Sequence, residues 1–280
     1  MSFGVVLALA SALVWGAGDF IGGLAARRSH HVHVLAVSAF SGILMLLASA
    51  GLWREAVPPV RALWWALPAG LSGAVGVASL YRGLSVGSAA VVAPIAAVIG
   101  ASVPVIVGVF VEGWPRITQA VGFVFAIAGI LSVTMSSAAG EDLKDGANEG
   151  IWAAGLAGVG FSGFFVFMAR VPQGAVFIPL VVARVIGLSA AVFLLAACRL
   201  PLPSLTSNPI ALLAGVLDAG GGVFFVLAKQ WTRFDVAAVL SSLYPVSTVL
   251  LARAVQKEHI RPAQWMGVAL CLAAVGLMVM

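Results

Sequence analysis

The sequence predicts an all-α integral membrane protein with ten transmembrane helices, arranged as two inverted repeats of five helices each. Three observations predict this class. Of the 280 residues, 62% are hydrophobic and only 9% are charged. Ten separate stretches are apolar over about 20 residues, the length that crosses the hydrocarbon of a bilayer. Features of the first half of the chain also recur 146 positions later, in the second half.

The composition excludes a soluble globular protein and a nucleic-acid-binding protein. About 25% of the residues in an ordinary soluble domain are charged, so this chain has too few polar side chains to cover its surface. The formal net charge is +5, but the basic residues are scattered singly, whereas nucleic-acid binding gathers them on one face. Cys198 and Cys271 have no metal-ligand spacing, so we expect neither a disulfide framework nor a zinc site.

The ten predicted spans follow one another with short connections, so consecutive helices should be antiparallel neighbours. No basic residue precedes the first span, which is also longer than the core of a signal peptide, and we therefore expect a permanent span. The expected spans are residues 3–25, 33–53, 62–81, 89–110, 116–135, 150–170, 175–197, 209–228, 236–255 and 262–280.

An acidic linker, 136–149, separates a first five-helix repeat, 1–135, from a second one, 150–280. Because five is an odd number, the second repeat enters the membrane from the opposite face, which makes the repeats inverted. Glu112 and Glu258 lie 146 positions apart and mark equivalent turns in the two repeats. The basic residues of the connections are divided almost evenly between the two faces, so the positive-inside rule gives no orientation.

Three ionisable residues lie inside predicted spans: Asp19, Arg184 and Asp218. A charge at such a depth costs several kcal/mol unless it is paired or faces water. One interpretation is a structural ion pair between Arg184 and one of the aspartates. The other is a central water-filled cavity, in which Arg184 binds a substrate carboxylate and an aspartate binds an ammonium group or carries a coupling proton.

Prolines inside spans provide a second group of candidates. Each removes a backbone donor, frees the carbonyl four residues earlier and bends its helix. The candidate gating kinks are Pro94 and Pro104 in the fourth span and Pro245 in the ninth, and the candidate substrate contacts beside the last of these are Ser241, Ser242 and Tyr244. The alternative is that these prolines only shape how the helices pack.

Two aromatic residues complete the candidate substrate site. Trp15 lies in the middle of the first span, where it can wall a binding site by stacking or simply fill the core. Tyr81 belongs to a polar cluster at the end of the third span. No catalytic, nucleotide-binding or metal-binding motif is present. We therefore expect no enzyme activity, no cofactor and no bound metal.

Parts of the first, ninth and tenth spans match a known pattern. They are Leu13-Val14-Trp15-Gly16 with Asp19-Phe20, then Ala237-Ala238-Val239-Leu240-Ser241-Ser242-Leu243-Tyr244-Pro245-Val246, and finally Glu258 with Gly267 nine residues later. With these residues the chain resembles the drug/metabolite transporter superfamily, and within it the EamA-type exporters. The first half departs from the pattern, because Pro94 lies earlier and Pro104 later than the position equivalent to Pro245.

The resemblance implies ten helices in two inverted repeats, cytoplasmic termini, and export of small metabolites, often amino acids, without ATP. By similarity to bacterial exporters of aromatic and other neutral amino acids, we expect a multi-pass protein of the bacterial inner membrane that exports such compounds by alternating access. The expected partners are a small-molecule substrate, membrane lipid and, where transport is coupled, a proton; we expect a monomer. Efflux of cationic drugs or toxicants is one alternative, and a non-transporting membrane scaffold is another.

Overall fold

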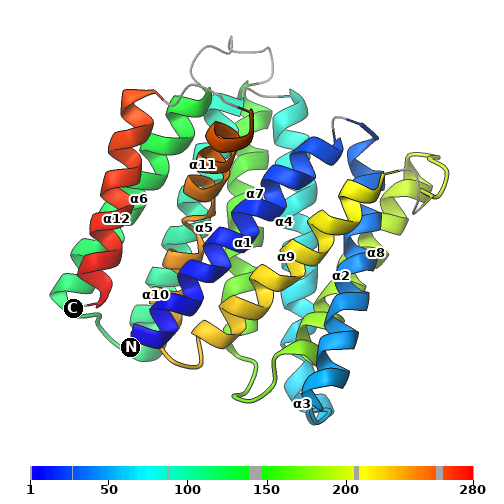
Figure 1. The fold of residues 1–280 in the computed structure, drawn as a ribbon, viewed down its shortest axis with the longest axis horizontal. Helices are drawn as coiled ribbons and strands as arrows, with labels where there is room; N and C mark the ends of the chain where they lie inside the picture. Colours follow the sequence, from blue (N-terminus) through cyan, green and yellow to red (C-terminus); the bar gives the residue numbers. More distant parts are fainter. Residues whose placement is uncertain are drawn as a thin grey trace.

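The computed structural model describes residues 2–26, 28–86, 89–138, 147–204, 208–256 and 261–279, and their regular secondary structure is helical (Figure 1). The helices are α1 (Ser2–Ala26), α2 (His31–Trp53), α3 (Val60–Leu63), α4 (Ala66–Val86), α5 (Ala89–Glu112), α6 (Ile117–Ala138), α7 (Ala147–Ala169), α8 (Phe177–Ala197), α9 (Pro209–Ala228), α10 (Phe234–Ser241), α11 (Tyr244–Gln256) and α12 (Pro262–Val279).

These helices confirm the predicted class of a ten-span membrane protein. Within the described residues, nine stretches are long and apolar enough to cross a bilayer, and α10 and α11 together form one of them. The tenth span is α4, whose apolar stretch, Ala66–Leu80, is shorter. The single-turn helix α3 precedes it in the connection from α2. An even number of spans returns the chain to the side where it began, and both termini lie at the same end of the bundle (Figure 1).

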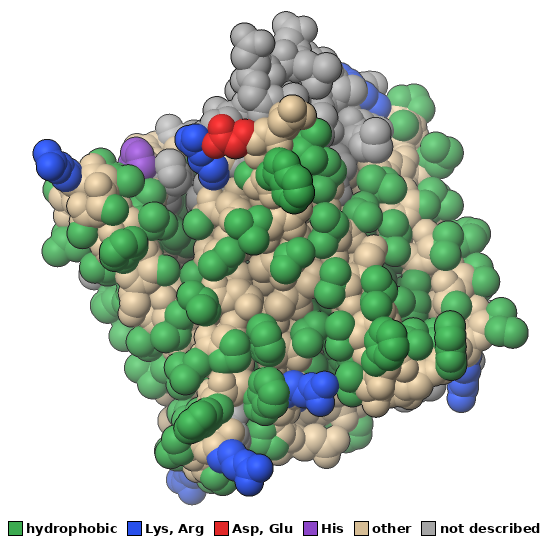
Figure 2. Space-filling view, turned by 180° about the vertical axis from the view of Figure 1, so that it is seen from behind, with side chains coloured by type: hydrophobic (Ala, Val, Ile, Leu, Met, Phe, Trp, Pro, Cys, Tyr) green, Lys and Arg blue, Asp and Glu red, His purple; other side chains and the backbone are tan. Residues whose placement is uncertain are grey.

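The surface of the bundle fits a lipid environment. Large apolar side chains are exposed along the helices, among them Leu13 and Phe193 at 60% and 71%. Figure 2 shows hydrophobic side chains across the middle of one face, with Lys and Arg side chains toward its two ends. Such an apolar band between charged ends is what a bilayer-spanning protein presents to hydrocarbon and head groups.

The contacts between helices follow the two-fold pattern expected of a repeated unit. The order α1, α2, α4, α5, α6 of the first half corresponds to α7, α8, α9, α10 with α11, α12 of the second. The pair α4 and α7 then corresponds to α9 and α1, and both pairs are extensively packed. In the same way, α5 packs against α7 as α10 and α11 pack against α1, and α2 packs against α9 as α8 packs against α4. Each half therefore packs mainly against the other half.

Small residues allow the closest approach between helix backbones in these contacts. A Cβ atom placed on Gly160 of α7 would lie 2.5 Å from the backbone nitrogen of Gly76 in α4. The two backbones approach so closely that no side chain fits between them, which is how helices associate in lipid. Glycine is required here by the neighbouring helix, since the position lies in regular helix.

The repeat is also visible in how two helices begin. Gln119 of α6 accepts a hydrogen bond from the N–H of Arg116 at 3.1 Å, and Gln264 of α12 accepts one from the N–H of Arg261 at 2.7 Å. Both glutamine side chains are buried. Each satisfies a backbone donor that the first turn of a helix leaves without a partner.

Candidate functional site

The structure brings together the charged residues that the sequence places inside the membrane. Arg184 of α8 forms an ion pair with Asp218 of α9, in which Nη1 donates to Oδ2. The exposed fractions of the two side chains are 22% and 43%. The sequence did not indicate which aspartate would pair with Arg184, and in the structure the partner is Asp218.

Arg184 and Asp218 lie on other faces of their helices than two large exposed apolar side chains. At about 100° per residue, Arg184 lies about 180° around α8 from the exposed Phe193, and Asp218 lies about 140° around α9 from the exposed Leu213. Leu213 is 49% exposed. The pair therefore joins α8 to α9 away from these two apolar side chains.

Asp19 of α1 lies close to this pair and differs from it in having no partner. Its side chain is exposed, and it makes neither a hydrogen bond nor an ion pair with any described residue. It lies about 120° around α1 from the exposed Leu13 and on the same face as the exposed Ala26. Its carboxyl is within electrostatic range of Asp218 and of Tyr244. An accessible acid without a partner at this depth is available to a ligand or a proton.

Trp15 anchors α1 next to the ion pair. Its indole N–H donates to the backbone carbonyl of Asp218 at 3.0 Å. Its ring is edge-on to Phe164 and Phe165 of α7 and stacked on Phe225 of α9. A Cβ atom on Gly221 would lie 2.5 Å from this ring. Trp15 therefore fills an aromatic core and holds α1 against α9 at the level of the charged group.

The candidates of the ninth span lie at an interruption of the helix. The regular α-helix is interrupted at Ser242 and Leu243, between α10 and α11, directly before Pro245. The Ser241 hydroxyl donates to the carbonyl of Ala8 at 3.4 Å, and that of Ser242 donates to Ala238 at 2.8 Å. Both serines are buried. Their hydroxyls therefore bond to backbone carbonyls of α1 and α10.

The corresponding span of the first half is not interrupted. α5 continues as one helix through Pro94 and Pro104, and Pro104 is buried. The side chains of Pro94 and Tyr81 lie outside the described part of the structure. The two halves thus differ at the place where the sequence suggested matching gates, because only the second half has a helix break.

A second polar group ties α5 to α10. The Arg233 guanidinium donates to the buried carboxyl of Asp235 at 2.8 and 3.1 Å, and to the carbonyl of Gly113 at 2.7 Å. The hydrogen bond to Asp235 raises the pKa of Arg233 above its ordinary value. Glu112 accepts the N–H of Phe234 at 3.1 Å. The end of α5 is therefore fastened to the start of α10 where the N-terminus lies.

The comparisons with known proteins agree with this architecture. The model of the EamA-like transporter family matches residues 2–135 and 148–280. None of the curated proteins matches the chain. One solved crystal structure shares the fold with a TM-score of 0.76 at 19% identity, over 99% of this chain and 96% of the other. The family match extends over nearly the whole chain and over both halves. The protein therefore belongs to the EamA-like transporter family.

Proposed function

We propose that this protein is a secondary transporter that exports small zwitterionic metabolites, above all aromatic and other neutral amino acids. Membership of a transporter family supports transport itself. The substrate class is our inference from the charges inside the bundle. Alternating access would expose these charges first to one side of the membrane and then to the other.

The observation that carries the proposal is the unpaired carboxyl of Asp19 beside the Arg184–Asp218 pair. An amino acid has an ammonium group, which a carboxylate binds, and a carboxylate group, which a guanidinium binds. Arg184 uses Nη1 for Asp218, and its other N–H groups have no partner among the described residues. The site thus offers both kinds of contact within a few side chains.

The same acid gives a route for coupling to a proton. A carboxylate cannot hold a proton and a substrate ammonium group at once, since protonation removes the charge that attracts the ammonium. Competition between the two at Asp19 would drive export when protons enter as substrate leaves. Asp19 therefore has the role of a shared substrate and proton site in our proposal.

Counterflow into proteoliposomes tests this function. Vesicles preloaded with an unlabelled neutral amino acid should accumulate the labelled compound, and Asp19→Asn should abolish its dependence on a pH gradient. Glu149→Gln is the matched control, because Glu149 pairs with Arg82 in an exposed ion pair, with side chains 56% and 60% accessible. Absence of counterflow for every neutral amino acid would overturn the proposed substrate class.

Efflux of cationic drugs is a second candidate, and a specific observation favours it. Two aspartates and one arginine leave the group with an excess of negative charge, which attracts an organic cation. Aromatic side chains such as Trp15 and Tyr244 also lie nearby. Competition between neutral amino acids and cationic dyes in the same vesicles distinguishes the candidates, because only a cation pathway is insensitive to Arg184→Met.

We further propose a monomer in the bacterial inner membrane with cytoplasmic termini, in which repeats 1–135 and 150–280 move about the linker 136–149. Under this topology Cys198, which is exposed after α8, faces the outside, whereas Cys271 is buried in α12. A membrane-impermeant maleimide should label intact cells, and Cys198→Ser should remove the label. Labelling only after permeabilisation would reverse the orientation.

A further inference from the structure

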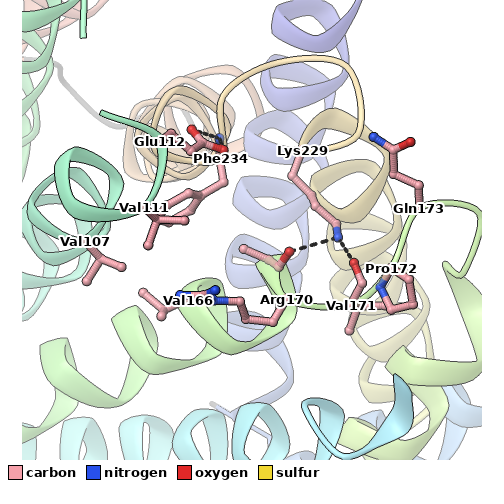
Figure 3. A pocket seen from close by; sticks show the side chains of 11 residues that line it. Val107, Val111, Glu112, Val166, Arg170, Val171, Pro172, Gln173, Lys229 and Phe234 are labelled. Carbon is pink, nitrogen blue, oxygen red and sulfur yellow. Dashed lines mark hydrogen bonds between the residues drawn. The ribbon is translucent and has the colours of Figure 1, made fainter. Parts of the chain in front are cut away.

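A pocket opens at the end of the bundle where the N-terminus lies, away from the Arg184–Asp218 pair. It lies among the ends of α5, α7 and α9 and the start of α10, and its volume is about 280 Å³ (Figure 3). Val107, Val111, Val166 and Phe234 give it apolar walls. This volume is near the lower limit of small-molecule sites, so the pocket suits a small ligand or a single head group.

Two cations line this pocket. The Lys229 ammonium donates to the backbone carbonyl of Ala169 at 3.1 Å and to that of Val171. An ammonium group has three N–H donors, so one remains for a ligand. Arg170 also lines the pocket, and its guanidinium has no ion-pair or hydrogen-bond partner among the described residues. Both donors are thus available beside apolar walls.

The one acid in the lining is already engaged. Glu112 accepts the N–H of Phe234, and its Oε2 lies 3.8 Å from Nε of Arg233. Arg233 is shared between Glu112 and the buried Asp235. With Lys229 and Arg170 counted as well, the formal charges beside the pocket add up to a net charge of +1. Lys229 is half-buried and Arg170 is exposed. Burial lowers the pKa of Lys229 to about 8, and a nearby anion would favour its charged form.

We propose that this pocket binds an anionic group, a carboxylate or a phosphate, attached to a small apolar body. The anion would contact Lys229 and Arg170, and the apolar part would contact the valines and Phe234. A soluble carboxylate and the phosphate of an anionic lipid share this chemistry, and basic pockets between transmembrane helices bind lipid head groups. The inference does not depend on the substrate proposed for the central group.

Fluorine NMR of 4-fluorobenzoate binding tests the proposal on the full chain in phosphatidylcholine nanodiscs. The neutral 4-fluorobenzamide is the control ligand. Fluorobenzoate should bind at least about tenfold more tightly, because a charge-assisted hydrogen bond contributes that much. 4-Fluorobenzoate has no ammonium group, so it cannot make the contact with Asp19 that we propose for the central site.

Arg170→Gln and Lys229→Met should each weaken fluorobenzoate binding about tenfold. Lys229→Met also removes two bonds to the end of α7, so its thermal unfolding must be compared with wild type. Arg170→Gln removes no contact with a described residue, and folding should be unaffected. Arg61→Gln is the control for surface charge, because Arg61 is exposed on α3 near the same end of the bundle.

Affinity for the anion should fall as the pH rises from 7 to 9. A base with a pKa of about 8 is mostly protonated below that pH and loses its charge above it. Arg170 and Arg233 keep their charge throughout this range, and Glu112 and Asp235 are the other charged groups nearby. An affinity that does not change between pH 7 and 9 would contradict a role for Lys229.

Nanodiscs that contain phosphatidylglycerol distinguish the two sources of the anion. Loss of fluorobenzoate binding in these nanodiscs identifies a lipid head group as the occupant, and undiminished binding identifies a soluble carboxylate. Both results support an anion site. Equal binding of fluorobenzoate and fluorobenzamide overturns it, as does a loss of binding in Arg184→Met with no effect of Arg170→Gln.

Discussion

Replacing Arg184 and Asp218 by uncharged residues, singly and together, distinguishes a structural role of this ion pair from a role in transport. Arg184→Met keeps a long apolar stem and removes the charge, and Asp218→Asn keeps the shape of the carboxyl group. An exposed ion pair contributes about 0–1 kcal/mol, and breaking a buried one costs about 3–5 kcal/mol. With side chains 22% and 43% exposed, the pair lies between these limits, and water screens part of the interaction. We expect each single substitution to lower stability by about 1–2 kcal/mol.

The double variant should recover most of that stability. Neither charge is left unpaired in Arg184→Met with Asp218→Asn, so the free energy of unfolding should return to within about 1 kcal/mol of wild type. Transport should not recover. Loss of a charge-assisted contact with the substrate carboxylate removes about 1.5–3 kcal/mol, which corresponds to about a 10- to 100-fold slower initial counterflow.

Two measurements on the same preparations provide the test: thermal unfolding in detergent and initial counterflow in proteoliposomes. Arg82→Gln, which breaks the exposed pair with Glu149, should leave both nearly unchanged. A double variant that regains transport together with stability would show that Arg184 and Asp218 only hold α8 against α9. The substrate contact proposed for Arg184 would then be refuted.

Two further predictions concern how the helices are held. Gly160→Ala should lower the unfolding temperature clearly, since the new Cβ would lie 2.5 Å from the backbone of Gly76; Gly155→Ala in the same helix, where no neighbour lies within 4 Å, is the control and should be neutral. Gln119→Ala should cost about 1 kcal/mol in the same assay, because it leaves the N–H of Arg116 without its acceptor, and an unchanged unfolding temperature would show that water replaces the side chain.

The sequence predicted the architecture because hydrophobicity is a local property. Each span can be recognised from its own apolar residues. Counting the spans then gave their number and the inverted order of the two halves. The ninth span shows the limit of this reasoning. Pro245 predicted a bend, but the interruption at Ser242 and Leu243 and the hydroxyl bond from Ser241 to Ala8 depend on how α10 meets α1.

The sequence predicted which charged residues form the candidate site, but it did not predict which of them pair with one another. The sequence identified Asp19, Arg184 and Asp218 as unusual, because charges at bilayer depth are costly. It did not indicate which aspartate pairs with Arg184. It also gave no role to Lys229, because a single basic residue at the end of a span is commonplace in a membrane protein.

The sequence by itself determined that this chain crosses a membrane ten times and that its second half repeats the first. Only the tertiary structure decided that Arg184 pairs with Asp218, that Asp19 has no partner among the described residues, and that Lys229 lies in a pocket with Arg170. The reason is physical. Crossing a bilayer depends on the residues of one segment, whereas charge pairing depends on the depth and rotation of several helices, which their mutual packing fixes.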